Sequence, residues 1–381
     1  MGTEIRTDTN NSKLDIKSMT LQELKTEMAA LEEKPFRAAQ IYRWLHQKNH
    51  GIRSFSQMTD ISGALAEKLD QRYYINALSI QRKLVSKIDG TVKYLFGLTD
   101  GNCVEAVVMR YKYGNSLCIS TQVGCKMGCK FCASTLAGWV RNLTPSEMLD
   151  EIYAAQEDTG EKIASLVLMG IGEPLDNYDN VIRFLTILSS PEGQNLSLRH
   201  VSLSTCGLVD RIYDLMKLKL GLTLSISLHA PNDEIRRQTM PVSLRYDIDT
   251  LLKACRDYFS YTGRRISFEY ALIAGVNDSP ECARELANRL KGMPCHVNLI
   301  PVNPVKERGY RRGSKQNILH FQQMLQHLGI NATVRRELGS DINAACGQLR
   351  RETEQANCAA AFPTSNQPSK PEGRVHLCSE Q

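Results

Sequence analysis

The stretch SLCISTQVGCKMGCKFC, residues 116–132, contains the strongest structural signal in the chain. Its first half is an apolar run that predicts a β-strand over 117–121. Its second half places three cysteines, Cys125, Cys129 and Cys132, within eight residues. The chain has 381 residues and 12 cysteines, and it is too long to be a small secreted domain held together by disulfides. The crowded triplet therefore indicates metal chemistry.

The kind of metal site follows from the number of cysteines in the loop. A structural zinc site is closed and tetrahedral, and its four ligands usually come as two separated pairs. Here the triplet has no second pair of cysteines or histidines at a suitable spacing. Three thiolates on a 4Fe-4S cube would leave one iron open to a small molecule, as catalysis at a metal requires. The residues favour such an open cluster, and three structural cysteines or a partial zinc site are the alternatives.

Downstream of the triplet, strand candidates and helical segments alternate along the chain. The strand candidates are 117–121, 164–169, 200–204, 222–228, 266–273, 295–300 and 331–335. The helical segments are 144–158, 178–188, 209–218, 247–261, 280–291 and 315–328. Alternation of this kind predicts parallel strands joined by right-handed crossovers. The expected fold class is therefore α/β, as a full or partial barrel or as an open sheet.

The turns that follow these strands contain residues suited to binding a ligand. In barrels the active-site loops gather at the carboxyl ends of the strands. Gly172 and Glu173 follow the second strand, where a glycine lets a ligand approach the backbone and a carboxylate can meet an ammonium group. Other such turns contain Ser204, Ser227, Leu228, His229 and Asn303. Taken alone, each is an ordinary strand-end turn, and His229 is more typical of a packed histidine.

Composition and hydrophobic pattern divide the chain into five segments. Residues 1–15 have no hydrophobic period and are expected to be disordered. Residues 16–76 have helical periodicity, and residues 77–115 alternate as a short β-meander that links this helical module to the barrel at 116–351. Residues 352–381 are a polar tail rich in Pro and Ser, which is also expected to be disordered.

Charge and hydropathy bound the partners. The net charge of +6 is too mild for a protein that binds nucleic acid by charge alone. A local stretch at 306–315 combines five basic residues with Tyr310, and Arg335 and Arg336 follow it. Cations beside an aromatic ring suit single-stranded RNA with an extruded base, although a solvated loop has the same composition. No apolar run approaches the roughly 18 residues of a membrane span, and the polar N-terminus is not a secretory signal, so we expect a cytoplasmic protein with no membrane partner.

Several of these motifs together resemble one protein family. They are residues 118–143, Gly172-Glu173-Pro174, Ser227-Leu-His-Ala230, Ile300-Pro-Val-Asn-Pro304 and Asp341-Ile-Asn-Ala-Ala-Cys346-Gly-Gln-Leu349. Over about residues 16–351 the chain closely resembles the RlmN/Cfr family of radical S-adenosylmethionine (SAM) RNA adenine methyltransferases. The resemblance implies a partial (βα)-barrel radical SAM core, an N-terminal helical module that serves as an accessory RNA-binding domain, and a C-terminal loop with a catalytic cysteine.

The resemblance also implies cofactors and the residues that hold them. Cys125, Cys129 and Cys132 would bind a 4Fe-4S cluster, whose open iron chelates S-adenosylmethionine. Other contacts to this cofactor would come from Gly172, Glu173, Ser204, Ser227, Leu228, His229 and Asn303. Two molecules of S-adenosylmethionine would be used in each turnover, one as the methyl donor and one as the source of the radical.

Three further residues would take part in the chemistry. Cys346 would accept a methyl group and, after that group loses a hydrogen atom, would add its carbon to the adenine ring. Glu105 would take the ring proton, and Cys118 would attack the sulfur of Cys346 to release the product, with a transient Cys118–Cys346 disulfide. Taken alone, Glu105 is typical of a surface carboxylate on a β-strand, and lone cysteines are usually inert packing groups.

The resemblance also bears on the position of methylation and on partners. The match at Glu105 favours C2 of adenine over C8, because the C8 branch, which is linked to ribosomal antibiotic resistance, lacks this acid. The motifs that begin at Tyr113, Cys132 and Gly339 resemble the C8 branch as well, so that branch stays as the alternative. The expected substrates are adenosines in 23S rRNA and tRNA, the expected electron donor is a flavodoxin or ferredoxin, and the expected state is a monomer. A radical enzyme that activates another protein, and a zinc-bearing RNA-binding protein without catalysis, are the competing interpretations.

Overall fold

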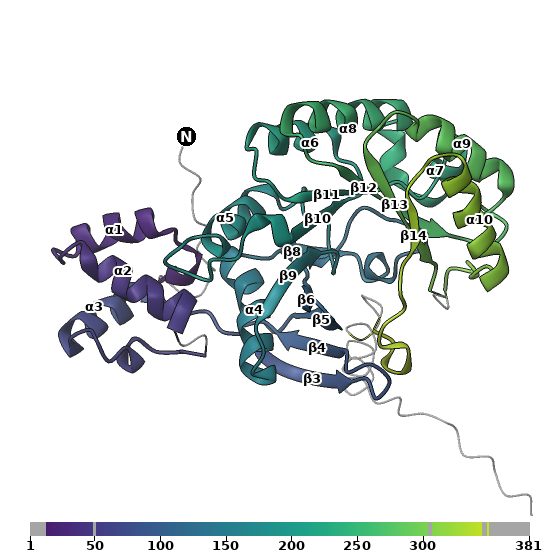
Figure 1. The fold of residues 1–381 in the computed structure, drawn as a ribbon. Helices are drawn as coiled ribbons and strands as arrows, with labels where there is room; N and C mark the ends of the chain where they lie inside the picture. The colour runs from purple at the N-terminus through teal and green to yellow at the C-terminus, as the bar shows by residue number, and fades with distance from the viewer. Residues whose placement is uncertain (1–12, 49–50, 304–306, 345–348, 350–381) are drawn as a thin grey trace, which may run out of the picture.

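The computed structural model describes residues 13–48, 51–303 and 307–344, together with Leu349. Figure 1 shows a curved sheet with helices over its outer side and a small helical module, coloured purple, beside it. The tail at 352–381 and residues 1–12 lie outside the described part of the chain. Strand β1 (Leu14–Asp15) pairs with β2 (Tyr73–Tyr74), so the last residues of the segment expected to be disordered are ordered within the module.

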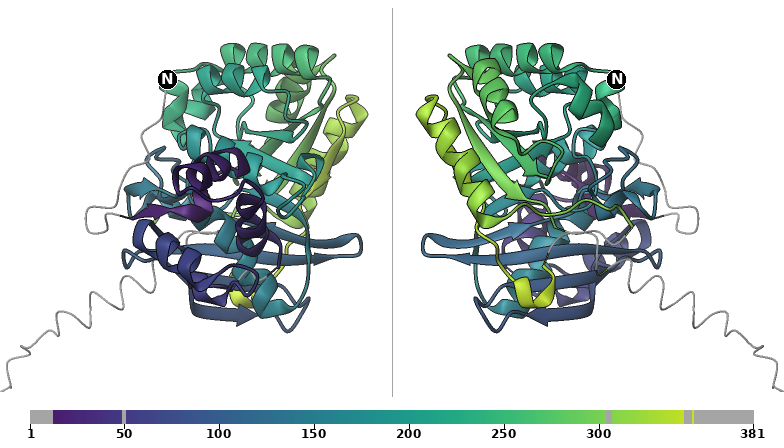
Figure 2. Two further views of the ribbon diagram at one scale, coloured as in Figure 1. Left: turned by 90° about the vertical axis from the view of Figure 1, so that its left-hand side faces the viewer. Right: turned by 90° about the vertical axis from the view of Figure 1, so that its right-hand side faces the viewer.

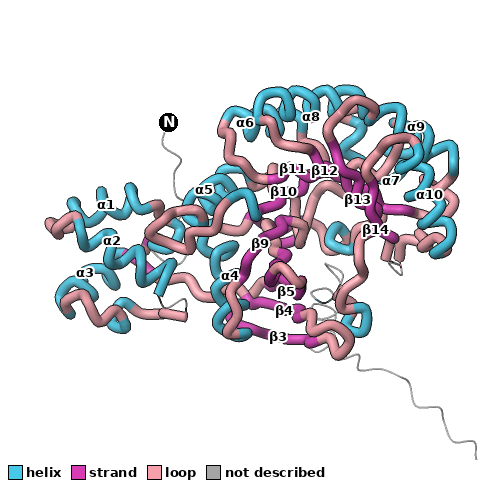
Figure 3. Tube along the Cα trace, viewed as in Figure 1, coloured by secondary structure: helices cyan, strands magenta, loops and turns pink. Residues whose placement is uncertain are grey.

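One ten-stranded sheet runs through the molecule (Figure 3). Its strands, in spatial order, are β14 (Ala332–Val334), β13 (Cys295–Pro301), β12 (Ile266–Leu272), β11 (Thr223–Ser227), β10 (Val201–Thr205), β9 (Ile163–Leu168), β6 (Gly114–Cys118), β5 (Cys103–Tyr111), β4 (Val92–Gly97) and β3 (Ser79–Val85). The pairs from β6 to β14 are parallel, and the pairs from β3 to β6 are antiparallel. The sheet thus joins a partial (βα)-barrel to an antiparallel extension.

The antiparallel extension contains the β-meander expected at 77–115, but it is not a separate linker. β5 pairs with β6 in a register that sets Val107 opposite Cys118. The backbone hydrogen bonds of the meander therefore continue those of the barrel without a break. Because residues opposite each other on paired strands share a face, side chains of β4 and β5 reach the same interior as those of the parallel strands.

Helices cover the outer side of the parallel strands (Figures 1 and 2). They are α4 (Pro145–Thr159), α5 (Tyr178–Leu188), α6 (Val209–Lys217), α7 (Asp233–Thr239), α8 (Ile248–Thr262), α9 (Pro280–Leu290) and α10 (Lys315–His327). Local sequence sets their ends: Thr144 and Glu147 form a capping box at the start of α4, and Gly160, with φ 67°, ends it. All but the short α7 lie where helices were predicted. In the part of the chain that the structure describes, no helix is long and apolar enough to cross a membrane.

Alternation along the parallel strands separates an apolar face from a polar one. Leu203 and Leu224 are fully buried in the core beneath the helices. Because successive side chains of a strand point to opposite faces, the neighbouring Ser204 and Ser225 face the barrel interior, as does Glu269 of β12. Parallel strands covered on both sides are usually apolar on both faces. A polar inner face therefore identifies the barrel interior as the place for a polar ligand.

The helical module is fastened to the barrel through a buried ion pair. Its helices are α1 (Leu21–Ala30), α2 (Phe36–Arg43) and α3 (Gly63–Arg72). The ammonium of Lys17 lies 2.7 Å from Asp150 Oδ1 on α4, and Asn76 donates to the other carboxylate oxygen at 2.8 Å. Burial raises the pKa of Asp150 to about 6, although the Lys17 charge acts in the opposite direction. Such a pair needs its full set of hydrogen bonds to offset desolvation, so it favours one placement of the module.

Candidate active site

The cysteine triplet lies in a loop whose two ends are joined by a two-stranded sheet. β7 (Gln122–Gly124) pairs with β8 (Trp139–Asn142), an element that was not predicted. Gly124 has φ 79°, and a Cβ there would lie 1.9 Å from the carbonyl oxygen of Gly138. The N–H of Cys125 donates to the same oxygen at 2.9 Å. Only glycine permits this close approach, so the local sequence fixes the base of the loop.

The three thiols lie close enough together to affect one another's ionisation. Burial raises the pKa of Cys125 to about 12, and the neighbouring Cys132 acts in the same direction. Burial also raises the pKa of Cys129, and both of the other cysteines add to the effect. A thiol in such surroundings becomes a thiolate when a strong cation binds it, as a metal does.

The donor set of three thiols in one loop fits a 4Fe-4S cluster, which three thiolates would hold with one iron left open. Among the described residues, no three His, Cys, Asp or Glu side chains converge closely enough to hold one metal ion. The Ser134 hydroxyl, two residues after Cys132, is buried and has no hydrogen-bond partner within the described part of the chain. It is available to donate to an acceptor such as a cluster sulfide.

Gly172 and Glu173 follow β9 and lie beside the cysteine loop. Gly172 has φ 111°, and a Cβ there would come within 2.8 Å of the backbone nitrogen of Gln122, so the position requires glycine. The buried carboxylate of Glu173 accepts hydrogen bonds from the N–H groups of Leu175 at 3.0 Å and Cys206 at 2.7 Å. Burial raises the pKa of Glu173 against these bonds. Besides any contact with an ammonium group, this carboxylate therefore joins two strand-end turns, a role that the sequence did not indicate.

Ser204, Ser227 and His229 lie at the ends of neighbouring strands. The hydroxyl oxygens of the two serines are 3.5 Å apart. His229 is buried with φ 57°, and its Nδ1 accepts the N–H of Ala271 at 2.8 Å. Burial lowers the pKa of His229 to about 3, so the ring is neutral with its proton on Nε2. Phe131 of the cysteine loop packs edge-on against this ring, with 4.8 Å between ring centroids, and so links the loop to the turn.

Arg236 is a residue of the site that the sequence did not indicate. It is fully buried on α7, and its guanidinium donates to the carbonyl oxygens of Cys206 at 2.7 Å and Leu228 at 3.3 Å. Its charge also acts on the thiol of Cys129, where it favours the thiolate form. Arg236 thus ties two strand-end turns together beneath the cysteine loop. Nothing in the sequence distinguishes it from the adjacent Arg237.

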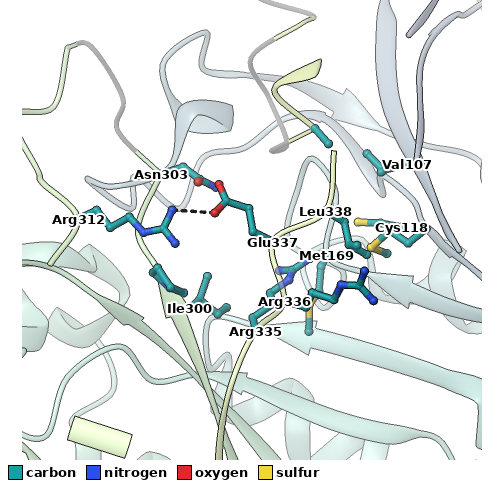
Figure 4. A pocket seen from close by; sticks show the side chains of 13 residues that line it. Val107, Cys118, Met169, Ile300, Asn303, Arg312, Arg335, Arg336, Glu337 and Leu338 are labelled. Atoms are coloured by element: carbon teal, nitrogen blue, oxygen red, sulfur yellow. Dashed lines mark hydrogen bonds and ion pairs between the residues drawn. The ribbon is translucent and has the colours of Figure 1, made fainter. Parts of the chain in front are cut away.

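A pocket of about 190 Å³ lies on the inner side of the sheet. Cys118 and Met169 line one side of it and Asn303 lines the other (Figure 4). Arg335 and Arg336 also line it, so the cavity combines apolar and sulfur-bearing walls with two guanidinium groups. The structure therefore brings Cys118 and Asn303, which are far apart in the sequence, to one cavity.

Glu105 is fully buried, in contrast to the surface carboxylate that its strand pattern predicted. Its Oε2 lies 2.9 Å from the ammonium of Lys93 on β4, and neither side chain is more than 1% exposed. Side chains two residues apart on a strand share a face, so Glu105 lies on the same face of β5 as Val107. Val107 is opposite Cys118 and lines the pocket. The expected proton acceptor and one of the expected thiols are therefore on one face of the sheet.

Cys346 lies outside the described residues. Ala344, the last described residue before it, lines the same pocket as Cys118. The described part of the chain therefore reaches the pocket two residues before the cysteine that is expected to accept the methyl group.

Two family models match the chain. The model of the Radical SAM superfamily matches residues 119–287. The model of the ribosomal RNA large subunit methyltransferase N-terminal domain matches residues 14–75, which form the helical module. The two matches cover the cysteine loop with most of the barrel and the module beside it.

Relatives cover almost the whole chain. The probable dual-specificity RNA methyltransferase RlmN of Alkaliphilus oremlandii is 56% identical over 340 residues, 89% of this chain and 98% of that protein. The protein of the same name from Lachnoclostridium phytofermentans is 53% identical over 339 residues, 89% of this chain and 95% of that protein. The crystal structure of a radical SAM methyltransferase from Sphaerobacter thermophilus matches with a TM-score of 0.83 at 41% identity, covering 88% of this chain and 98% of that one. The chain therefore belongs to the RlmN family of radical SAM RNA methyltransferases, whose chemistry uses a 4Fe-4S cluster and S-adenosylmethionine.

Proposed function

We propose that this enzyme methylates C2 of an adenosine in 23S rRNA and in tRNA, with the methyl carbon held on Cys346. The pocket is the observation that supports the proposal most, because Cys118 and Ala344 line the same cavity and Ala344 is two residues before Cys346 in the sequence. Methyl transfer through one thiol and release by another requires two cysteines at one substrate site. The relatives named as dual-specificity RNA methyltransferases support an RNA substrate of more than one kind.

A radical route is needed because of the carbon that is methylated. C2 of adenine is electron-poor and cannot displace a sulfonium leaving group as a nucleophile. When bound, the cluster and S-adenosylmethionine supply a 5′-deoxyadenosyl radical, which can remove hydrogen from an unactivated methyl group. The enzyme's own part is to present that methyl group on a thioether next to the base.

Three side chains of this chain act in the proposed sequence. Cys346 accepts a methyl group on sulfur, that group loses a hydrogen atom, and the carbon bonds to adenine C2. Glu105 removes the proton from the ring carbon, and the unpaired electron of the adduct passes to an acceptor such as the oxidised cluster. The thiolate of Cys118 then attacks the sulfur of Cys346, so the sulfur–carbon bond breaks, the released carbon takes a proton to become the methyl group, and a Cys118–Cys346 disulfide forms. Two molecules of S-adenosylmethionine are used per methyl group, one for the methyl and one for the radical.

Glu105 supports C2 over C8 as the position of methylation. It lies on the pocket-lining face of β5 and is held by Lys93 at 2.9 Å, so its carboxylate has a fixed place beside the cavity. The C8 reaction of the Cfr branch is the second candidate, because the motif at Cys132 is similar in both branches. The methylated nucleoside distinguishes the two.

Arginines at the pocket support a nucleic-acid substrate. Arg335 and Arg336 line the cavity, and Arg312 pairs with Glu337 at its rim, 2.9 Å apart (Figure 4). Arginine side chains position an RNA backbone by contacting its phosphates, while the base to be modified leaves its stack to enter the cavity. We also propose a flavodoxin or ferredoxin as the electron donor, a monomeric enzyme and, since rRNA and tRNA are found there, a cytoplasmic location.

An isotope experiment tests this chemistry. The anaerobically reconstituted enzyme is given RNA and S-adenosylmethionine with a trideuterated methyl group, and the nucleosides are analysed by mass spectrometry. We expect methyladenosine that retains two deuterium atoms and 5′-deoxyadenosine that gains the third. A methyl group transferred with all three deuterium atoms would contradict hydrogen abstraction from the methyl carbon. Cys346→Ala is the control and should form no methyladenosine.

A further inference from the structure

Residues 335–344, which we call the strap, cross the open edge of the partial barrel. In Figures 1 and 2 the strap runs from the end of β14 to the turn at 86–91 that joins β3 to β4. Leu338 and Ala344 of the strap line the pocket and pack against Val107 and Cys118 of the sheet, and Figure 4 shows Leu338 beside Cys118. The strap is therefore one wall of the cavity in which we place the reaction.

Two aspartates, one in the strap and one in the β3–β4 turn, each accept hydrogen bonds from the other segment. Asp341 of the strap accepts a hydrogen bond from the Ser86 hydroxyl at 2.6 Å and another from the N–H of Lys87 at 2.9 Å. In return, Asp89 of the turn accepts the N–H of Gly339 at 2.9 Å. Hydrogen bonds to a carboxylate are stronger than those between neutral groups. The strap and the turn are thus held together by a carboxylate from each side.

A third contact joins the strap to the barrel interior. The ammonium of Lys93 lies 2.9 Å from the Glu105 carboxylate and 3.1 Å from the carbonyl oxygen of Asn343. A buried ammonium is costly to desolvate unless partners of this kind complete its hydrogen bonds. Lys93 therefore connects the end of the strap, three residues before Cys346 in the sequence, to the proposed proton acceptor.

The backbone of the strap is shaped to fit the turn. Gly339 has φ 61° and Asn343 has φ 47°, both in the left-handed region that few side chains favour. A Cβ on Gly339 would lie 2.7 Å from the Cβ of Ala344 and 3.1 Å from Cγ2 of Thr91. The tip of the strap is thus a compact turn that packs directly on Thr91 of the β3–β4 turn.

We propose that Asp89, Lys93 and Asp341 are positioning residues, which dock the strap as a wall of the pocket that Cys118 also lines. The inference rests on the proposed function, because it gives these contacts a purpose in methyl transfer. The cysteine loop belongs to other elements, so the dock acts on transfer to RNA and not on cluster binding. An enzyme with a loosened strap would still cleave S-adenosylmethionine, but the methyl carbon would seldom meet the base.

The main variant is chosen so that the fold survives. Asp341→Asn is the main test, because Asp341 is exposed and its loss leaves no buried charge. Asp158→Asn is its matched control, since it removes the 2.5 Å ion pair with Lys83 of β3, and the other partner of Asp158, the Tyr94 hydroxyl on β4, also lies outside the strap. Lys93→Met and Lys93→Arg form a second pair, in which only the arginine retains the charge.

Hydrogen–deuterium exchange on the reconstituted holoenzyme tests the dock itself. We expect Asp341→Asn to speed the exchange of backbone N–H groups in residues 335–344 about fivefold, the loss of roughly one hydrogen-bonded contact. Asp158→Asn should leave that exchange at the wild-type rate. Unchanged exchange of the strap in both Asp341→Asn and Lys93→Met would overturn the dock, whatever reaction the enzyme performs.

Product ratios test the purpose of the dock. In Asp341→Asn and Lys93→Met, 5′-deoxyadenosine formed per methyladenosine should rise severalfold at unchanged iron content, and Lys93→Arg should return toward the wild-type ratio. An unchanged ratio in the loosened variants would overturn the positioning role. Wild-type enzyme that makes methyladenosine without ever bearing a methyl group on Cys346 would contradict the proposed function, and the exchange result would still decide the dock.

Discussion

Two regions of the molecule are held by hydrogen bonds between residues at very different separations along the chain. One is the set of turns around the cysteine loop, and the other is the contact between the strap and the turn at 86–91. The carboxylate of Glu173 bonds Leu175, two residues away, and Cys206, 33 residues away. Asp341 bonds Ser86, which is 255 residues away. The first region is made of local motifs whose residues are chemically unusual, and the second is made of common residues that become a site only on folding. Substitutions around the cysteine loop should therefore abolish a whole step of the reaction. Substitutions at the strap should leave cleavage of S-adenosylmethionine intact but separate it from methyl transfer to RNA.

The largest effect is expected in the cysteine loop. Cys129→Ala removes a thiolate ligand, so the reconstituted protein should lose the iron and form no 5′-deoxyadenosine. Iron analysis and the visible absorption spectrum measure this directly. Cys255→Ala is the control, because Cys255 is a fully buried thiol in the core under the helices and should leave the iron content unchanged. Full iron binding by the Cys129 variant would remove the basis of the cluster assignment.

Cys118→Ala should stop turnover at a later point. Without the second thiol nothing releases the carbon from the sulfur of Cys346, so enzyme and RNA should remain covalently joined. A band of protein bound to RNA on a denaturing gel, at unchanged 5′-deoxyadenosine formation in a single turnover, is the expected result. Multiple turnovers by this variant would show that Cys118 has no part in product release.

Gly172→Ala should have an intermediate effect, on cofactor affinity. The new Cβ would meet Gln122 at a φ of 111°, and strain of this kind costs about 1–3 kcal/mol. Binding of S-adenosylmethionine should weaken about tenfold or more in titration calorimetry. Gly101→Ala separates the causes, because Gly101 has φ 84° but no atom within 4 Å of its Cβ position. Equal affinity in the two variants would mean that the turn does not contact the cofactor.

The smallest expected effect is a pH dependence of the stability that Asp89 contributes by holding the strap. Desolvation opposes it, but hydrogen bonds from the N–H groups of Gly339 and Thr91 lower the pKa of Asp89 from 3.8 to about 2. A carboxyl group with a lowered folded-state pKa contributes stability above about pH 4, and that contribution is lost as the pH falls toward 2. Asp89→Asn should therefore melt below the wild type at pH 6, and the gap should narrow as the pH falls through 4. A gap in melting temperature that is constant from pH 6 to 3 would contradict this assignment.

Local periodicity is why the parallel half of the fold could be predicted from the sequence. The helices of the barrel other than the short α7, and the strands from β9 to β14, lie where the pattern placed them, whereas β6 (Gly114–Cys118) begins and ends three residues before the strand predicted over 117–121. The pattern failed for Glu105, because alternation on β5 cannot tell water from Lys93 of the neighbouring strand. The pattern also failed to show that residues 77–115 belong to the barrel sheet and are not a separate linker, since the pairing of β5 with β6 is not visible in either strand alone.

The candidate site divides in the same way. The cysteine triplet and the Gly172-Glu173 turn could be predicted, because their residue types and spacing are themselves the chemical signal. Arg236 and Lys93 could not, since a basic residue becomes a buried cation only through contacts with distant carbonyl and carboxylate groups. Their roles follow from burial, which no single segment of sequence determines.

The most direct test of the account is the identity of the methylated nucleoside. RNA from cells that lack the enzyme is treated with the reconstituted protein, digested to nucleosides and compared with synthetic standards by mass spectrometry. We expect 2-methyladenosine in both 23S rRNA and tRNA. Finding 8-methyladenosine without 2-methyladenosine would contradict it.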